Sequence, residues 1–336
     1  MQTDIDILEN EILKQYPEVL DILLRDHTTH KNIFWATDDY ENLGKDYHFD
    51  AQILPELITG KNGSIIMPRV QKDILLQQSR SRDMAEVFTP SWICNAQNNL
   101  IDNAWFGREN VFNTELKKSN GFKWNINKDI VIFPENKTWR DYVKDTRLEM
   151  ACGEAPYITS RYDTTTGKFI PVENRIGILD RKLRVISENV ESTGEWLKWT
   201  QMAYKNTYGF EFHGDSLLIA REAMLVTFID NYKEKFGKEP LLKSIQYIAY
   251  IISWNVWQMD GLKGVVPNTC GEITITDIDL FGNKKTESSF CRGCMDNNIL
   301  RHNGTYCLIK DWSNKDLTTG KKGRKIRFVD LLKNMR

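Results

Sequence analysis

Leu148-Glu-Met-Ala-Cys-Gly-Glu-Ala-Pro-Tyr157 is the stretch of this sequence that decides the fold. Its apolar start predicts a short strand over 148–152, and Gly153 supplies the turn that follows. Small residues at such a turn let the backbone approach a ligand closely, and a following helix offers free N–H groups. On spacing alone, such a segment is more often a plain turn than a nucleoside-binding loop.

Strand and helix patterns alternate on the C-terminal side of this stretch. Apolar spacing predicts helices over 196–204, 216–235 and 241–253, with strands over 208–212 and 255–258. This alternation is typical of an α/β domain with a largely parallel sheet. Ligands of such sheets sit beyond the carboxyl ends of the strands, where most of the motifs below are expected.

The N-terminal part of the chain is dominated by helical patterns. Residues 3–26 keep helical spacing around Pro17, which predicts two short helices. A strand is expected over 32–36 and a helix over 91–104. The sequence therefore predicts an α-rich region over 1–83, an α/β domain over 84–268 and a cysteine-rich tail over 269–336.

The composition is that of a globular protein, with 41% apolar residues, 27% charged residues and a net charge of −1. No apolar run approaches the roughly 18 residues of a membrane span. The acidic start, Met1-Gln-Thr-Asp-Ile-Asp-Ile7, lacks the basic end of a signal peptide, so we expect a cytoplasmic protein without membrane association. Nucleic-acid binding depends on a local basic surface, for which 69–82 and 321–327 are the candidates.

Two segments, in this order, resemble the adenine-specific DNA methyltransferases of restriction–modification systems. Val87-Phe-Thr-Pro90 matches the opening motif of that family, and 149–157 is similar to its Asp/Glu-Pro-Ala-Cys-Gly-Ser/Thr-Gly-x-Phe loop. The lead-in, 80–86, is also similar. The resemblance implies a Rossmann-like fold that binds S-adenosylmethionine (SAM). It implies cofactor-binding roles for Phe88, Thr89, Pro90, Glu149, Cys152, Gly153 and Tyr157.

Two later segments look like further landmarks of the family. In 208–221 a strand ends near Glu211, whose carboxylate can accept two hydrogen bonds from a ribose diol. Helix capping by Glu211 or Asp215 is the alternative. In 255–262 the resemblance places Asp260 near the adenine ring, whereas a simple Asp-Gly turn is the alternative.

The sequence departs from the family loop at four positions, Met150, Glu154, Ala155 and Pro156. Glu154 brings a charge where the family has a small hydroxyl. Ala155 replaces a glycine, and it permits close approach of a ligand if its backbone stays outside the left-handed region. These departures leave room for SAM but change the expected shape of the loop.

The family's Asn/Asp/Ser-Pro-Pro-Tyr/Phe/Trp loop, which accepts hydrogen bonds from the target amine and stacks on a flipped base, does not occur in this sequence. Near its expected place, Asn268 and the Pro267 carbonyl are the candidate catalytic acceptors. The first hypothesis is an adenine methyltransferase acting on double-stranded DNA in a restriction–modification or phage-defence system. The second is a non-catalytic SAM- and DNA-binding subunit, and a nuclease is the third. The short remaining chain implies that a partner protein, or the N-terminal region, recognises the target. The partner would be another subunit, or a second copy of this chain in a homo-oligomer.

Four of the six cysteines crowd into the tail. Cys270, Cys291, Cys294 and Cys307 lie within 38 residues, and Cys291-Arg-Gly-Cys294 is a Cys-x-x-Cys knuckle. Four thiolates suit a tetrahedral structural zinc ion, which would order a polar segment with few large apolar residues. His302 is a substitute ligand for Cys270, and free buried cysteines are the alternative to zinc.

Overall fold

The computed structural model of the chain describes residues 5–7, 9–84, 86–118, 121–278, 284–316, 320 and 322–335. Its centre is a three-stranded parallel sheet in the order β3 (Arg147–Met150), β4 (Thr207–Glu211), β5 (Val256–Gln258). Helices fill both connections: α7 (Ile178–Asn189) and α8 (Thr193–Lys205), then α9 (Gly214–Phe236) and α10 (Leu242–Asn255). The predicted α/β class is confirmed.

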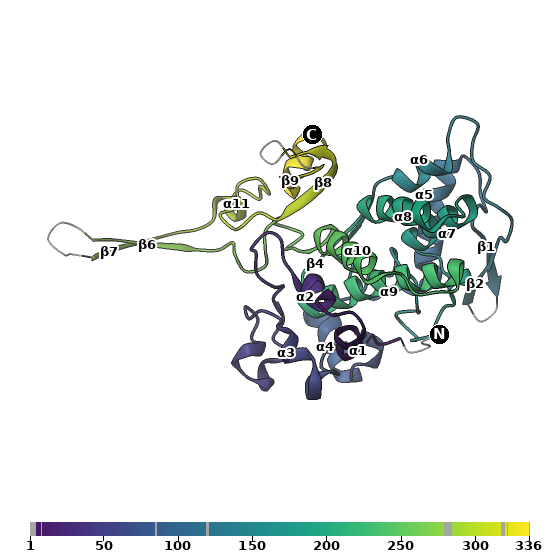
Figure 1. Cartoon of the computed structure of the whole chain (residues 1–336). Helices are drawn as coiled ribbons and strands as arrows, with labels where there is room; N and C mark the ends of the chain where they lie inside the picture. Colours follow the sequence, from purple (N-terminus) through teal and green to yellow (C-terminus); the bar gives the residue numbers. More distant parts are fainter. Residues whose placement is uncertain are drawn as a thin grey trace.

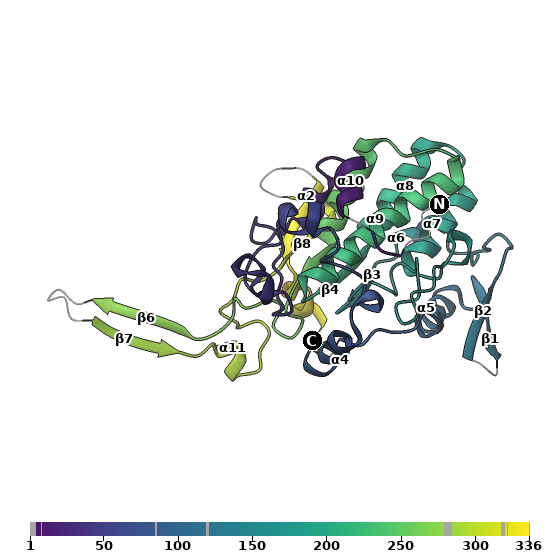
Figure 2. The same cartoon turned by 90° about the horizontal axis from the view of Figure 1, so that it is seen from below.

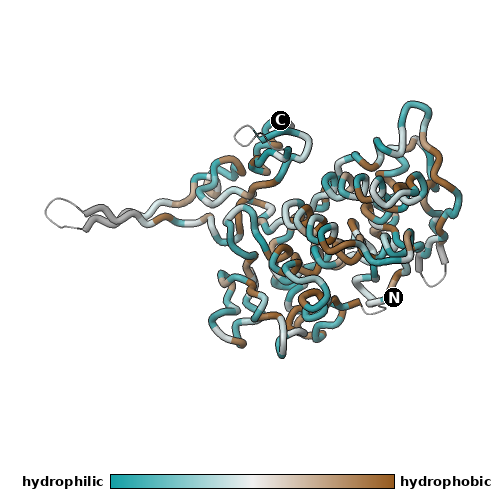
Figure 3. Tube along the Cα trace, in the orientation of Figure 1, coloured by the Kyte–Doolittle hydropathy of each residue, from teal (hydrophilic) through white to brown (hydrophobic). Residues whose placement is uncertain are grey.

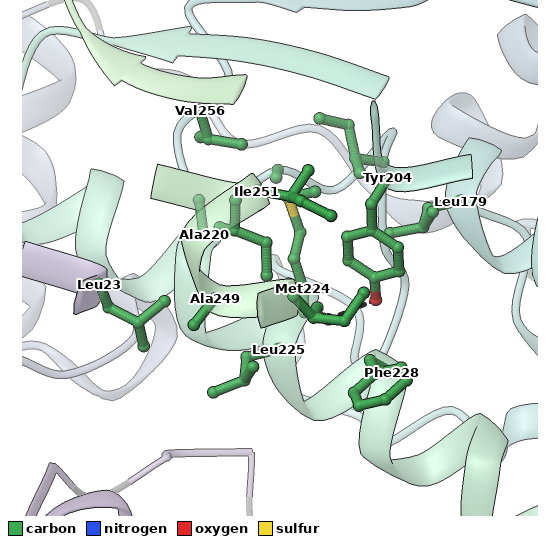
Figure 4. Packing of buried hydrophobic residues seen from close by; sticks show 14 of the residues in the cluster. Leu23, Leu179, Tyr204, Ala220, Met224, Leu225, Phe228, Ala249, Ile251 and Val256 are labelled. Atoms are coloured by element: carbon green, nitrogen blue, oxygen red, sulfur yellow. Dashed lines mark hydrogen bonds between the residues drawn. The ribbon is translucent and has the colours of Figure 1, made fainter. Parts of the chain in front are cut away.

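Helix α9 lies at the centre of the core and is buried along most of its length. Its Met224 and Phe228 pack beside Tyr204 of α8 and Ile251 of α10 (Figure 4). The Tyr204 hydroxyl donates to the Met224 carbonyl at 2.8 Å, so the one polar atom of this aromatic side chain is paired inside the core. Burial of these apolar faces holds the helices against the sheet.

The N-terminal region packs onto the same core. Helices α1 (Glu9–Gln15) and α2 (Val19–Leu24) lie on either side of Pro17, as predicted. Buried Arg221 of α9 donates to the carbonyls of Leu23 and Arg25 and to that of Val256 in β5. A cation suits the carbonyl end of a helix, so this side chain ties α2 to the sheet.

The strand predicted over 32–36 is wrong. Phe34 makes only an isolated bridge to Gln52, and its backbone N–H and C=O pair with the side chain of Gln258 at 2.8 and 2.9 Å. A glutamine side chain thus takes the place of a neighbouring strand. Further helices of this half are α3 (Pro55–Ile58), α4 (Ile74–Asp83), α5 (Ser91–Phe106) and α6 (Trp139–Lys144).

Three antiparallel hairpins complete the described chain, and the sequence patterns did not predict them. They are β1 (Asn113–Lys118) with β2 (Gly121–Ile126), β6 (Ile273–Ile278) with β7 (Lys284–Ser289), and β8 (Leu308–Lys315) with β9 (Lys322–Arg327). The β6–β7 hairpin projects away from the body in both views (Figures 1 and 2). The tail also contains α11 (Arg292–Met295) and α12 (Phe328–Leu331).

Short 3₁₀ helices interrupt the loops at Glu41–Leu43, Lys45–Tyr47, Gly60–Asn62, Arg69–Gln71, Val172–Asn174 and Leu332–Met335. Apolar segments gather in the helical body (Figure 3). A single cluster of buried apolar residues runs from Ile12 to Val256, and a second, with Phe210, Trp257 and Phe328, lies between the sheet and the C-terminal hairpin. Every helix in the described part of the chain is too short or too polar to span a bilayer.

Candidate functional site

A cavity of about 610 Å³ lies beyond the carboxyl ends of β3 and β4. Four segments far apart in the sequence surround it, namely 36–38, 86–89, 149–153 and 211–213. The cavity therefore gathers most of the residues predicted to bind a cofactor. Those that line it are Phe88, Thr89, Glu149, Cys152, Gly153, Tyr157 and Glu211.

The loop after β3 has an unusual backbone. Ala151, Gly153 and Ala155 all have left-handed φ angles, of 49°, 52° and 58°. The left-handed region costs an alanine about 1–2 kcal/mol, and such residues concentrate at ligand sites. Ala155 was expected to permit close approach of a ligand only if its backbone stayed outside the left-handed region, and it does not stay outside that region. Ala155 is fully buried and does not line the cavity, so close approach is left to Gly153.

Glu211 is held at the end of β4 with its carboxylate facing the cavity loop. The Gly153 N–H donates to its Oε2 at 2.8 Å, and the His213 N–H donates to its Oε1 at 3.2 Å. Helix α9 begins at Gly214 with His213 at its N-cap and without a side-chain cap bond. Glu211 therefore does not cap the helix, and it couples the β3 loop to the β4 loop.

The segment 86–90 folds over this loop. The Phe88 ring lies against Gly153, with 3.7 Å between its Cζ and the position that a Cβ would occupy. Pro90 precedes α5 and does not line the cavity, and the Ser91 N–H donates to Asp163 at 2.7 Å. The Asp163 carboxylate thus satisfies the first free N–H group of helix α5.

A buried ion network holds the 86–90 segment in place. Fully buried Arg80 donates to Asp215, Glu86 and Asp39, with closest distances of 2.9, 2.9 and 2.6 Å. Lys72 also donates to Asp215 at 2.7 Å. Burial raises the pKa of Asp215, but Lys72 and Arg80 outweigh it and hold the pKa well below its usual range.

The network corrects one prediction from the sequence. The basic segment 69–82 was a candidate for nucleic-acid contacts, yet Lys72 and Arg80 point into the protein. Arg69 also makes contacts within the protein. Its guanidinium donates to the Ser81 hydroxyl, and its Cζ lies 5.1 Å from the centroid of the Phe88 ring. These cations are used inside the fold, because the carboxylates beside them would otherwise be buried without partners.

The lining of the cavity is acidic. It includes Asp38, Asp83, Glu86, Glu149 and Glu211, and no lysine or arginine occurs among its described lining residues. Burial raises the pKa of Glu149 to about 8, although its carboxylate accepts hydrogen bonds from the Tyr157 and Ile158 N–H groups at 3.3 and 3.1 Å. Glu149 therefore keeps its proton at neutral pH, and Glu86 is paired with Arg80, so Asp38 and Glu211 supply the negative charge that favours a cation over an anion.

Glu154 brings a charge where the family loop has a small hydroxyl, and it is not among the described residues that line the cavity. The side chain is buried and accepts hydrogen bonds from the Arg69 N–H at 2.6 Å and the Tyr162 hydroxyl at 2.5 Å. Burial raises the pKa of Glu154 to about 7 against these two bonds. It anchors the 69–72 segment beneath the loop.

Three further predicted residues lie away from this cavity. The Asp260 carboxylate accepts from the Leu262 and Lys263 N–H groups at 3.0 and 3.2 Å, the geometry of an Asp-Gly turn. Exposed Asn268 and buried Pro267 precede Cys270 in the tail. None of the three is among the described lining residues, so their roles toward the cofactor and the target amine stay predictions.

Other lining residues were not predicted from the sequence. Phe49 and 36–38 reach the cavity through a segment of bridges and turns, which has no periodic signal. His213 and Phe212 follow β4 directly, and their place at the carboxyl end of a predicted strand is the signal that could have found them. Asp83 is the last residue of α4 and Met84 is its C-cap, and both belong to the 80–86 segment that precedes the family's opening motif.

A second centre forms where the tail leaves the body. Cys270, Cys291, Cys294 and His302 place their sulfur and Nδ1 atoms within 4.8 Å of one another. The Cys270 sulfur lies 3.3 Å from that of Cys291 and 3.6 Å from that of Cys294, and the His302 Nδ1 lies 3.3–3.6 Å from the three sulfurs. The cluster could hold a metal ion such as zinc.

The surroundings support a ligand role for these side chains. The Asn303 N–H donates to the Cys291 sulfur at 3.3 Å, a bond that stabilises a thiolate. Gly293 of the knuckle is required for close approach, because a Cβ there would lie 2.7 Å from the His302 Nδ1. The cluster is therefore tightly packed around the four ligand atoms.

Cys307 is not a ligand, which corrects the predicted set. It is fully buried in the second apolar cluster, and its sulfur lies 3.3 Å from the Gln258 carbonyl of β5. His302 replaces Cys307 as the fourth member of the cluster. The sequence had indicated His302 as a substitute for Cys270 instead. The spacing could not decide between His302 and Cys307, because Cys307 starts the turn into β8 and is drawn into the core by its apolar neighbours.

Comparisons with known proteins provide no family for the chain. It matches no protein-family model, no curated protein and no solved structure. A functional interpretation therefore depends on the shape and charge of the cavity and on the Cys/His cluster.

Proposed function

We propose that the cavity binds SAM and that the chain serves SAM-dependent methylation of adenine in double-stranded DNA. The observation that carries this proposal is the acidic lining at the carboxyl ends of parallel strands, with no lysine or arginine among its described residues to receive phosphates. SAM is a cationic nucleoside with a sulfonium and an ammonium group, whereas nucleotide cofactors carry phosphates that these carboxylates would repel. The volume is within the range of about 300–1,000 Å³ usual for small-ligand sites.

The topology supports the same reading. Three parallel strands in the order β3-β4-β5, with β3 first in the chain, correspond to one half of a doubly wound, Rossmann-like sheet. In such folds a nucleoside sits at the ends of the first two strands. The left-handed loop after β3 and the acid at the end of β4 lie at those positions.

Individual residues fit parts of this cofactor. Glu211 can accept hydrogen bonds from a ribose diol through lone pairs that Gly153 and His213 leave free. Phe88 and Tyr157 offer aromatic faces, and Asp38 and Glu211 can offset the positive charges. SAM, when bound, would supply an activated methyl group, and the chain would orient it and exclude water.

Zinc is the metal that the Cys/His cluster fits best. Bonds of about 2.3 Å to sulfur and about 2.0 Å to nitrogen place tetrahedral ligand atoms roughly 3.5–3.8 Å apart, close to the spacing seen here. Four protein ligands leave no open position, so the ion would be structural. It would fix the base of the β6–β7 hairpin, which Cys270 and Cys291 bracket.

The direct test is calorimetry of the chain with SAM, ATP and NAD, followed by transfer of a labelled methyl group to adenine-containing duplex DNA. We expect SAM to bind with micromolar affinity while the phosphorylated nucleotides do not bind. An absence of SAM binding, or tighter binding of ATP, would contradict the proposal.

A second candidate, a SAM- and DNA-binding subunit without its own transfer activity, is favoured by the position of Asn268. This residue and Pro267 are not among the described lining residues of the cavity, so the acceptors predicted for the target amine are not seen there. A partner would then supply the acceptor. SAM binding with retained DNA and no methyl transfer, restored by a partner protein, would select this candidate.

A further inference from the structure

A second cavity, of about 410 Å³, lies between the β1–β2 hairpin and the loop 163–174. Its wall includes Lys123 and Trp124 of β2, and Lys168 and Phe169 of the loop. Neither the motifs nor the SAM proposal assigns it a role. Its position and charge relative to the first cavity suggest one.

The two cavities share a wall. Thr89 lines the first cavity and Ser91, two residues later, lines the second. The loop is fastened to this wall, because the Thr164 hydroxyl donates to the Thr89 carbonyl at 3.1 Å and Asp163 accepts from the Ser91 N–H at 2.7 Å. A ligand in the second cavity would therefore lie directly beside a cofactor in the first.

The charge of the second cavity is opposite to that of the first. Lys123 and Lys168 are both exposed in its wall, whereas Asp163 is the one acid among its described lining residues. The Asp163 oxygens already accept hydrogen bonds from Ser91, Thr165 and Thr166. Against the effect of burial, these bonds lower the pKa of Asp163 to about 2, so it stays ionised while its oxygens are occupied. Two lysines against one aspartate leave the described wall with a net charge of +1, which would attract an anion.

Aromatic faces stand beside these cations. Trp124 is half-buried, and its indole N–H donates to the Asn174 carbonyl at 3.2 Å, which holds the ring in place. Half-buried Phe169 lies on the other side of the loop. Lysines that contact phosphate and aromatic rings that stack on bases are the usual elements of a nucleic-acid strand site, each stacked base contributing about 1–3 kcal/mol.

We propose that the second cavity holds a nucleotide of the DNA strand, with its phosphate at Lys123 and Lys168 and its base against Trp124. This inference depends on the proposed function only in taking DNA as the substrate. It separates the two ligands by charge: a cationic cofactor on one side of 89–91 and a polyanionic strand on the other. The shared wall brings a base of that strand within reach of the cofactor cavity.

The test uses the full chain and a fluorescent adenine-containing DNA, as duplex and as single strand, in anisotropy titrations over a range of salt. The variant K123Q/K168Q should bind on the order of tenfold more weakly at about 0.1 M salt. Its salt slope should fall by about 1.8 for duplex or about 1.4 for single strands. The matched control, K61Q/K243Q, removes two exposed lysines elsewhere and should leave both values unchanged.

A stacking test completes the assignment. DNA should quench the emission of wild-type protein more than that of Trp124→Phe, which keeps an aromatic ring, and Trp124→Ala should weaken binding further. Calorimetry with SAM should give the same affinity for K123Q/K168Q as for wild type, so a failure here is distinct from a failure of the cofactor proposal. The proposal is overturned if wild type does not bind DNA, prefers RNA, or loses no more affinity in K123Q/K168Q than in the control.

Discussion

The cofactor cavity and the Cys/His cluster are built in opposite ways. The four cluster residues lie between Cys270 and His302, and their ligand atoms converge through short turns such as the Cys291–Cys294 knuckle. The cavity draws on segments from 36 to 213, which meet only because the helices and the ion network pack as they do. A local site can be organised by a metal ion, whereas a distributed site depends on the stability of the whole core.

The largest expected effect is on the local site. Cys291→Ser combined with Cys294→Ser should reduce the bound metal from about one ion per chain to none, because two of four ligands are lost. Structural zinc contributes on the order of 10 kcal/mol to such segments, so proteolysis within the tail should become fast. Metal analysis and limited proteolysis measure these outcomes.

The control for this experiment is Cys307→Ala, which removes a cysteine that is not in the cluster. It should retain the metal. SAM affinity should stay within about twofold of wild type in the double serine variant, because the cavity draws nothing from the tail. Metal loss in Cys307→Ala would restore the ligand set expected from the sequence.

The next effect is on the distributed site. Arg80→Met removes the centre of the buried network and leaves Asp215 and Glu86 short of a partner, which should lower the free energy of unfolding by about 3–5 kcal/mol. SAM binding should weaken with it, because 86–89 would lose its anchor. Urea denaturation gives the stability. Arg82→Met, at the exposed neighbour on the same helix, should behave as wild type.

A smaller effect is expected for the cavity's chemistry alone. Glu211→Gln should weaken SAM binding by about 1.5–3 kcal/mol, roughly 10- to 150-fold, because a charged acceptor is replaced by a neutral one. Calorimetry measures the change, and Glu191→Gln, whose side chain is exposed, serves as the control. Equal affinities in Glu211→Gln and wild type would remove this residue from the site.

The last expected effect is a dependence of the free energy of unfolding on pH. The pKa of Glu149 is raised to about 8, so the folded chain keeps a proton that the unfolded chain releases above about 4.5. Stability should therefore fall as pH rises from about 4.5 to about 8, relative to Glu149→Gln, by at most about 1.4 kcal/mol per pH unit. Urea titrations of both proteins at intervals between pH 5 and 8.5 would show it, and parallel profiles would contradict it.

Much of the α/β region could be read from periodicity. The predicted helix 216–235 corresponds to α9, and the strand 208–212 corresponds to β4, because both are long enough to show their pattern and both face the core. Two of the hairpins were missed although one strand of each alternates, 122–126 and 273–276, because the partner strands 113–118 and 284–289 are polar and carry no alternation to detect. The strand predicted over 32–36 was wrong because the Gln258 side chain, rather than a neighbouring strand, pairs with the backbone N–H and C=O groups of Phe34.

The sequence by itself determined the parallel strands, the placement of 86–89 and 149–153 at one site and the presence of a cysteine cluster. These follow from local patterns and from motif order. Only the tertiary structure decided that Lys72 and Arg80 face inward, that His302 replaces Cys307, and that Asp260 and Asn268 lie outside the cavity lining. Such outcomes depend on which distant partner offsets the cost of burying each group, and spacing along the chain does not record it.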